Sequence, residues 1–178
     1  AYYNALLDNN DDTLVTSNVN INKSNFDNGN GNGLYVYTNG NILVNKISSS
    51  NHGNAGADGV LLDNSSGTGS VSILNTYGAN TINYNNEYNL YVSTNGVVTV
   101  TGLEASYSNS SSGAIIRNHL ALSGNPGVTV SNSTFRQNSN GEGLSIVSAG
   151  AITLTNITAQ SNGYCNAKLD NHYDLTLT

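Results

Sequence analysis

Pairs of apolar residues separated by one position recur along the chain, and this pattern limits the available folds more than any other feature. The first pair is Ala5/Leu7, and a second pair, Val19/Ile21, follows it in the same repeat. Each repeat begins with a Gly or an Asn, and the repeats start 23 to 30 residues apart. The starting residues are Asn4, Gly33, Gly59, Asn89, Gly113, Gly143 and Asn166. Apolar residues at every second position predict strands with one buried face.

Short strands repeated at this spacing predict a solenoid, in which each repeat is one coil hydrogen-bonded to the next. We therefore expect an all-β parallel β-helix of six to seven coils, with three strands per coil and no capping helix. The chain is predicted to be a single domain, residues 1–178. Long and short connections alternate, which gives double-coil repeats at about 4–58, 59–112 and 113–165, with 166–178 starting a further coil.

A third inward-facing pair is predicted to alternate in size between neighbouring coils. Ile47/Ser49 is large then small, whereas Ser133/Phe135 is small then large, so stacked layers would interlock without voids. The pair Thr76/Gly78 does not follow this rule. At the start of each coil, Gly or Asn predicts a corner with positive φ, because these residues adopt that conformation most readily.

The composition fits stacked coils and excludes some partners. Five basic and eleven acidic residues give a net charge of −6, and like charges on neighbouring strands would repel. A column of Asn, Thr and Ser is expected to form a ladder instead; it comprises Asn9, Thr38, Asn64, Thr94, Asn118, Ser148 and Asn171. The sequence shows no Lys/Arg cluster for nucleic acid and no apolar run long enough to insert into a membrane.

The coil at residues 127–147, GVTVSNSTFRQNSNGEGLSIV, resembles the repeat of the parallel β-helix proteins of the pectate-lyase-like superfamily. This resemblance extends over the whole chain and implies a right-handed parallel β-helix. Within that superfamily, the chain is most similar to the non-catalytic surface adhesins and filament proteins. The superfamily also includes lyases and hydrolases, so the resemblance specifies the fold far better than the activity.

Residues 163–178 repeat the pattern of residues 1–16, which places both segments at equivalent positions of a coil. We therefore expect the stack to continue past both segments, with identical protomers joined head to tail or within a longer tandem array. Uncapped coils expose inward apolar side chains and unpaired strand edges. The expected axial contacts are Ala5, Leu7, Leu169, Leu175 and Leu177. The predicted function is a structural subunit of a secreted or cell-surface filament, sheath or adhesive fibre, with the chain itself as the main partner.

Large side chains point outward from the first strand of most coils and predict a lateral interface with a second fibre strand. They are Leu6, Tyr35, Leu61, Tyr91 and Ile115. Two other functions remain open on the outer surface. A carbohydrate-binding adhesin would stack sugars of surface glycans on Tyr35 and Tyr91. An ice-binding protein would use outward T-x-T pairs such as Thr99/Thr101, Thr129/Ser131, Thr153/Thr155 and Thr176/Thr178.

No catalytic constellation is recognisable, so no enzyme activity is predicted, although a polysaccharide lyase or hydrolase remains the third alternative. Asp8, Asp63 and Asp170 share one column but lie in coils far apart, and Arg117 in that column has no acidic neighbour. We expect the histidines at 52, 119 and 172 to be solvated loop residues. The run at residues 8–12 offers Asp8, Asp11 and Asp12 as Ca²⁺ ligands, but it lacks a known Ca²⁺-loop spacing, so no cofactor is predicted. The single cysteine, Cys165, is expected to be a small, partly buried residue that contributes only to packing. The alternative is that it forms an intermolecular disulfide.

Overall fold

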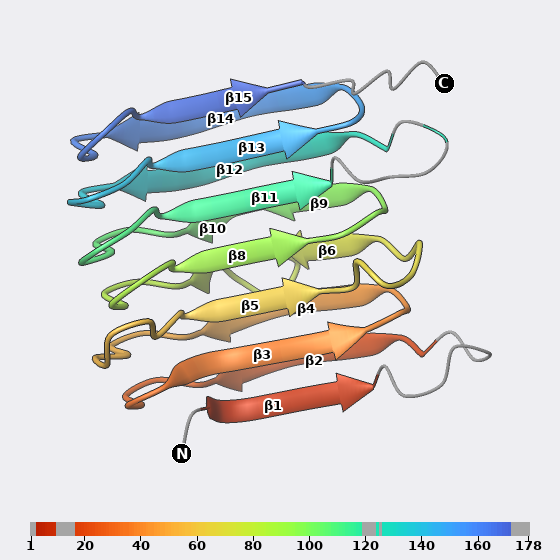
Figure 1. Ribbon diagram of the computed structural model, residues 1–178, viewed down its shortest axis with the longest axis horizontal. Helices are drawn as coiled ribbons and strands as arrows, with labels where there is room; N and C mark the ends of the chain where they lie inside the picture. The colour runs from red at the N-terminus through yellow and green to blue at the C-terminus, as the bar shows by residue number, and fades with distance from the viewer. Residues whose placement is uncertain (1–2, 10–16, 119–123, 125, 172–178) are drawn as a thin grey trace.

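The computed structural model is an all-β parallel solenoid of about six turns, and the residues that it describes contain no helix (Figure 1). It describes residues 3–9, 17–118, 124 and 126–171. Successive coils lie one above another, so strands that are neighbours in space come from consecutive repeats of the sequence. The predicted fold class is confirmed.

One side of every coil is formed by a seven-stranded parallel sheet, called sheet A here. Its register pairs the inward apolar residues of each coil with those of the next, as in Leu34↔Val60 and Val60↔Leu90. The strands of sheet A, in spatial order, are β1 (Tyr3–Asn9), β3 (Asn32–Thr38), β5 (Val60–Asp63), β8 (Leu90–Ser93), β11 (Ala114–Asn118), β13 (Leu144–Ser148) and β15 (Ala167–Asp170).

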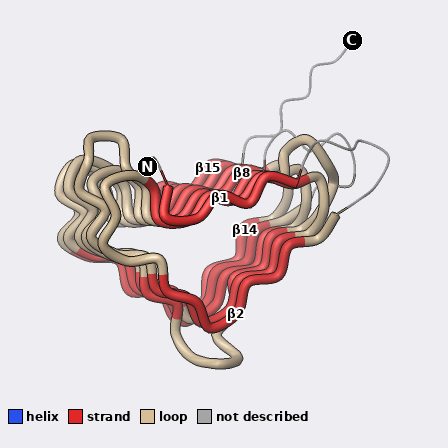
Figure 2. The backbone as a smooth tube through the Cα atoms, turned by 90° about the horizontal axis from the view of Figure 1, so that it is seen from below, coloured by secondary structure: helices blue, strands red, loops and turns tan. Residues whose placement is uncertain are grey.

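The other two sides are formed by sheet B, whose longest strands bend where the second and third predicted strands meet (Figure 2). In five of the described coils, a residue with positive φ lies at this bend. These residues are Lys23, Lys46, Gly102, Asn132 and Asn156. The strands of sheet B are β2 (Val19–Asn25), β4 (Ile42–Ser48), β6 (Val71–Leu74), β7 (Asn80–Thr81), β9 (Val98–Thr101), β10 (Leu103–Glu104), β12 (Val128–Arg136) and β14 (Ile152–Gln160).

The third inward pair of the coil containing β6 is Asn80/Ile82, not Thr76/Gly78 as the sequence pattern indicated. Asn80 pairs with Leu103, and both Asn80 and Ile82 are fully buried. From Ile73 to Asn80 is seven positions, whereas Val44 to Ile47 is three, so this corner carries four extra residues. The loop at residues 75–79 protrudes beside β2 in Figure 2. With the insertion counted, this coil also follows the small-then-large rule.

The glycines that open the coils are required by close packing rather than by positive φ, so the predicted cause of the corner was wrong. None of the four glycines at these positions is among the residues with positive φ. A Cβ at Gly59 would lie 2.3 Å from the Asn85 amide nitrogen and 2.7 Å from the Asn89 carbonyl oxygen. A Cβ at Gly33 would meet Ser49 and His52 in the same way. The chain therefore enters sheet A where the next coil and the interior leave no room for a side chain.

A single apolar core extends along the interior of the stack. The inward residues of β3, β5, β8, β11 and β13 are fully buried, and Phe135 is the largest side chain buried there. Phe135 pairs with Ala159 in the next coil, and Ala105 occupies the equivalent position in the preceding one. The predicted interlocking of large and small side chains therefore describes this part of the core.

Candidate functional site

The inward apolar columns are open at both described ends of the stack. Leu7 is 40% exposed and Leu169 is 48% exposed, whereas the residues in the same column of the inner coils are fully buried. Ala5 and the inward residues of β14 are partly buried for the same reason. Of the predicted axial contacts, Leu175 and Leu177 lie outside the described residues. Because more than half of the Leu7 and Leu169 side chains is already covered, full burial of each would contribute about 1 kcal/mol.

A hollow of about 490 Å³ lies between β1 and β2 at the lower end of the stack. Its apolar lining comes from Leu6, Leu7 and Val19, and its polar rim includes Asp8 and Asn9. Among the described strands, β1 pairs only with β3 and β2 only with β4, so the outer edges of β1 and β2 carry no strand. A further coil placed here would cover the hollow and complete both edges.

The predicted lateral stripe forms one continuous column on the outer face of sheet A. The pairings Leu6↔Tyr35, Tyr35↔Leu61 and Leu61↔Tyr91 place its members in successive coils, and Ile115 follows Tyr91. Two further tyrosines pack against it: the rings of Tyr3 and Tyr35, and those of Tyr88 and Tyr91, have centroids 5.6 Å apart.

Exposure decreases along this stripe. Leu6 is 49% exposed, Tyr35, Leu61 and Tyr91 are half-buried, and Ile115 is only 8% exposed. Burial, with the nearby Asp63 carboxylate, raises the pKa of Tyr35. The stripe is therefore a set of side chains packed on one another, with its most accessible apolar surface at the lower end.

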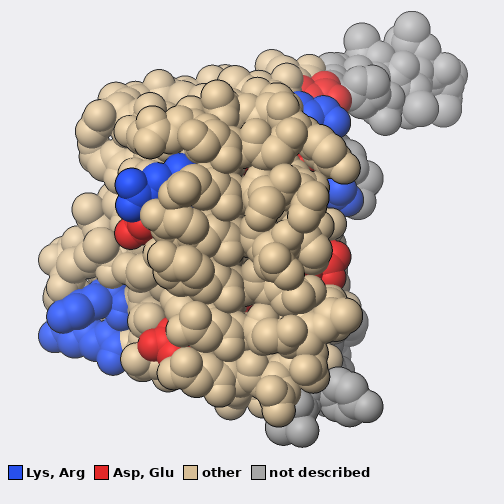
Figure 3. Space-filling view, turned by 90° about the vertical axis from the view of Figure 1, so that its left-hand side faces the viewer, with Lys and Arg blue, Asp and Glu red and all other residues tan. Residues whose placement is uncertain are grey.

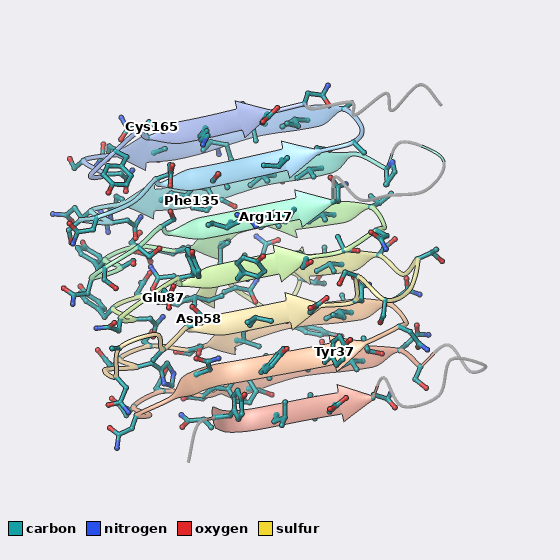
Figure 4. The ribbon with its side chains drawn as sticks, in the orientation of Figure 1. Tyr37, Asp58, Glu87, Arg117, Phe135 and Cys165 are labelled. Atoms are coloured by element: carbon teal, nitrogen blue, oxygen red, sulfur yellow. The ribbon has the colours of Figure 1, made fainter. Side chains whose placement is uncertain are left out.

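On the outer face of sheet A, the register keeps Asp8 and Asp63 apart from each other. Asp8 and Asp63 are two coils apart, with Tyr37 between them in the register. The guanidinium of Arg117 lies over the Tyr91 ring, 5.7 Å from its centroid, and its strand neighbours are Ser93 and Val147 (Figure 4). Asp8 and Asp63 therefore share one column of sheet A, as the sequence pattern indicated.

The column of Asn, Thr and Ser five residues into each coil is buried from Thr38 to Ser148 and exposed at Asn9 and Asn171, and it is not a ladder of side chains bonded to one another. Asn64 donates its amide hydrogens to the carbonyl oxygens of Gly40 and Gly69, and Thr94 donates to Gly69. Asn118 donates in the same way to Pro126. These side chains therefore satisfy the carbonyl groups of the first corner, where the strand direction changes.

The hydroxyl-bearing pairs of sheet B do line up on its outer face. Thr99↔Thr129 and Thr129↔Thr153 are in register, and the hydroxyls of Thr101 and Ser131 are hydrogen-bonded. The regular part of the described face covers β9, β12 and β14, because the equivalent pairs in two earlier coils are Leu43/Asn45 and Ser72/Leu74. Thr176 and Thr178 lie outside the described residues.

Asp58 and Glu87 bring two carboxyl groups together in neighbouring coils (Figure 4). Burial raises the pKa of Asp58 to about 7, and the nearby Glu87 carboxylate contributes in the same direction. The Tyr88 backbone N–H donates to Asp58 Oδ1 at 3.1 Å and partly offsets this. The sequence pattern missed this pair because the two residues are 29 positions apart.

His52 is fully buried, so the expectation of a solvated loop residue was wrong. Its backbone N–H donates to Asn85 Oδ1 at 3.2 Å, and its Nε2 lies 3.3 Å from the Ser49 hydroxyl. Burial lowers the pKa of His52, which keeps the imidazole neutral near pH 7. The histidines at 119 and 172 lie outside the described residues.

His52 belongs to a buried column of polar side chains at the third corner of the coil, where the chain leaves sheet B and enters sheet A. The sequence analysis also missed this column. Asn138 donates to Asn162 Oδ1 at 2.9 Å and accepts from Asn89 at 3.2 Å. Asn85 in turn donates to Asn89 Oδ1 at 2.9 Å. The signal available in the sequence was the spacing of four between Asn85 and Asn89, repeated at Asn162 and Asn166.

No group of three or more His, Cys, Asp or Glu residues that would hold a metal ion occurs among the described residues. Asp8 is in β1, while Asp11 and Asp12 of the Ca²⁺ candidate set lie outside the described part. Cys165 is a free thiol on the surface rather than partly buried, because the coil containing β15 has no neighbour on its outer side among the described residues (Figure 4). No helix in the described part is long and apolar enough to cross a membrane.

The chain matches no protein-family model, no curated protein and no solved structure.

Proposed function

We propose that this chain is a structural element of an extracellular or cell-surface filament, sheath or adhesive stalk. Its chemistry is self-association: coils stack on further coils through the open ends of the solenoid, and no substrate is turned over. The observation that carries the proposal is the change in burial within a single column, from fully buried in the inner coils to 40–48% exposed at Leu7 and Leu169.

Two physical terms favour end-to-end stacking. Inward side chains at each end gain free energy on leaving water, and the outer edges of the end strands gain hydrogen bonds. The register already used between coils offers the geometry, since Leu7 pairs with Val36 and Ile146 pairs with Leu169. A further coil in the same register, from this chain's array or from another copy, would continue both columns.

The coil motif also supports membership in the pectate-lyase-like superfamily of parallel β-helix proteins. The residues that support it are those of β12 and β13, whose inward positions Val128, Val130, Phe135 and Leu144 are all buried as that repeat requires. Within that superfamily, the non-catalytic filament and adhesin proteins fit this chain best, because its inward apolar column is exposed at both described ends of the stack.

Electron microscopy and light scattering of the purified chain test the proposal. We expect concentration-dependent, unbranched threads with an axial repeat of about 29 Å for six coils spaced about 4.8 Å apart. Leu7→Asp and Leu169→Asp should each shorten the threads or abolish them, because a carboxylate would be buried in the end contact.

Val97→Asp is the matched control, since Val97 is 47% exposed but does not belong to the inward columns. This variant should assemble like the parent chain. A monodisperse monomer at every concentration would overturn the proposal, as would equal effects of all three substitutions.

A further inference from the structure

The two lysines of sheet B lie in neighbouring coils and line one groove, although they are 23 residues apart in the sequence. The register Asn22↔Asn45 and Ser24↔Ile47 makes Lys23 and Lys46 equivalent positions of adjacent strands. The groove has a volume of about 430 Å³, and its other polar lining residues are Ser24, Asn25, Ser48 and Thr81. Figure 3 shows the largest group of basic side chains on the face in view toward the N-terminal end of the stack. The fold therefore brings together two basic residues that are far apart in the sequence.

Two terms make it energetically unfavourable to place lysines at these two positions: the backbone conformation and the repulsion between their charges. Both residues have positive φ, 53° for Lys23 and 56° for Lys46, a conformation that Gly and Asn adopt at lower cost. The equivalent corners of later coils carry Gly102, Asn132 and Asn156. Like charges on adjacent strands also repel each other. A chain with only five basic residues has placed two of them where neither the backbone nor the charge is favourable.

Among the described residues, no carboxylate forms an ion pair with either lysine. The ion pair that the described residues form is Arg136 with Glu104, at 3.4 Å, and neither lysine has a carboxylate oxygen within 4.0 Å of its ammonium group. Asp27 lies beside the groove, where its carboxylate accepts a hydrogen bond from the hydroxyl of the lining residue Ser48 at 2.7 Å. The charged side chains that line the groove are therefore the two lysines.

The loop at residues 75–79 holds both lysine side chains in place. The ammonium nitrogen of Lys23 lies 4.5 Å from the centroid of the Tyr77 ring. A Cβ at Gly78 would lie 3.5 Å from Lys46 Cδ, so the backbone of the loop packs along the Lys46 stem. The Tyr77 backbone N–H donates to Asn45 Oδ1 and fixes the loop to the coil below. The loop thus packs against both lysine side chains, and Ala79 at its end lines the groove.

We propose that this groove binds a dianionic tetrahedral oxyanion, of the class of inorganic phosphate or a phosphate monoester. Two ammonium groups one coil apart match the two charges of such a group, and Lys binds phosphate as a point charge. The side chains of Asn25 and Thr81 supply further hydrogen-bond donors around it. A bound dianion would remove the repulsion between the lysines, whereas a monoanion would neutralise only half of it.

The three lysines of the chain make a direct test available. Lys23, Lys46 and Lys168 give three signals in a ¹³C spectrum of protein labelled at lysine Cε, and Lys168 in β15 is an internal control. The probes are inorganic phosphate, glycerol phosphate, acetate and chloride at matched ionic strength. Saturable shifts of the Lys23 and Lys46 signals with phosphate or glycerol phosphate alone are expected. If both phosphates shift them, the site takes free and esterified phosphate; if only one does, that source is the ligand.

Lys23→Asn and Lys46→Asn separate binding from folding, because Asn already occupies this corner in β12 and β14. Each variant should unfold at the same or a higher temperature than the parent, yet bind phosphate about tenfold more weakly or worse. Asp27→Asn should bind it more tightly. Equal, non-saturating shifts of all three lysine signals, shifts with acetate as large as those with phosphate, or no shift at all would overturn the proposal.

Discussion

At the residue scale, the sequence did not predict which polar side chains are buried at the third corner of each coil. The periodic pattern correctly placed the inward apolar residues, because alternation within a strand depends only on local geometry. It could not place Asp58 beside Glu87 or His52 inside the stack, because these positions depend on how the corners of different coils meet. The cause of the coil-opening glycines was likewise invisible, since the atoms that exclude a Cβ at Gly59 belong to residues 85 and 89.

Asp58 should make the stability of the fold depend on pH between about 4 and 7. Its pKa is about 7 in the folded state and near 3.8 when unfolded, so the folded state holds the proton more tightly. Its contribution to stability is therefore complete below pH 3.8 and is lost as the pH rises through 7. Asp58→Asn cannot ionise and keeps an oxygen for the Tyr88 N–H, so the variant should become increasingly more stable than the parent over this range.

Urea unfolding of both proteins from pH 4 to pH 8 measures this difference. At about 1.4 kcal/mol per pKa unit, the gain of the variant should reach a few kcal/mol at pH 8 and be small at pH 4. His52 gives the opposite dependence, because its lowered pKa removes stability as the pH falls below 6.5. A constant difference between Asp58→Asn and the parent across this range would show that Asp58 ionises normally.

At the scale of single elements, the third strand of each coil shows how far the pattern is predictive. The alternation of large and small pairs was predicted from Ile47/Ser49 and Ser133/Phe135 and describes the packing. The pair Thr76/Gly78 was misplaced because an insertion shifts the register by four positions, and nothing local to residues 75–79 marks them as outside the strand. The insertion at this corner is therefore the cause of the misplaced pair.

Phe135 should be the side chain on which this interlocking depends most. It is fully buried between the small residues Ala105 and Ala159, which cannot move to fill its volume. Phe135→Ala should therefore lower the free energy of unfolding by about 3–5 kcal/mol, from lost transfer energy and a residual cavity. Tyr164→Ala, at a residue that is 77% exposed, is the aromatic control and should change it by no more than about 0.5 kcal/mol. Similar losses in the two variants, measured by urea unfolding, would show that the layers do not interlock as described.

At the scale of the whole molecule, each coil of the solenoid contacts only its neighbours, so stability accumulates along one axis. The inner strands β8 and β9 have a coil on both sides, whereas β1 and β15 have one described neighbour each. Opening an end coil breaks one interface and opening an inner coil requires two. The burial of side chains follows the same gradient, from exposed in β15 to buried in β13.

Hydrogen exchange measured peptide by peptide should therefore report both this gradient and the proposed stacking. In dilute solution, the amides of β1 and β15 should exchange at least about tenfold faster than those of β8 and β9, because end coils open locally. Raising the protein concentration should slow exchange in β1, β2, β14 and β15 while leaving β8 and β9 unchanged, since association stabilises only the surfaces that it covers. Uniform protection along the chain would contradict the one-dimensional description, and end strands insensitive to concentration would contradict stacking between copies. End strands that are insensitive to concentration would still be compatible with the gradient of protection along one chain. The experiment therefore distinguishes the stability of the single stack from its assembly with other copies.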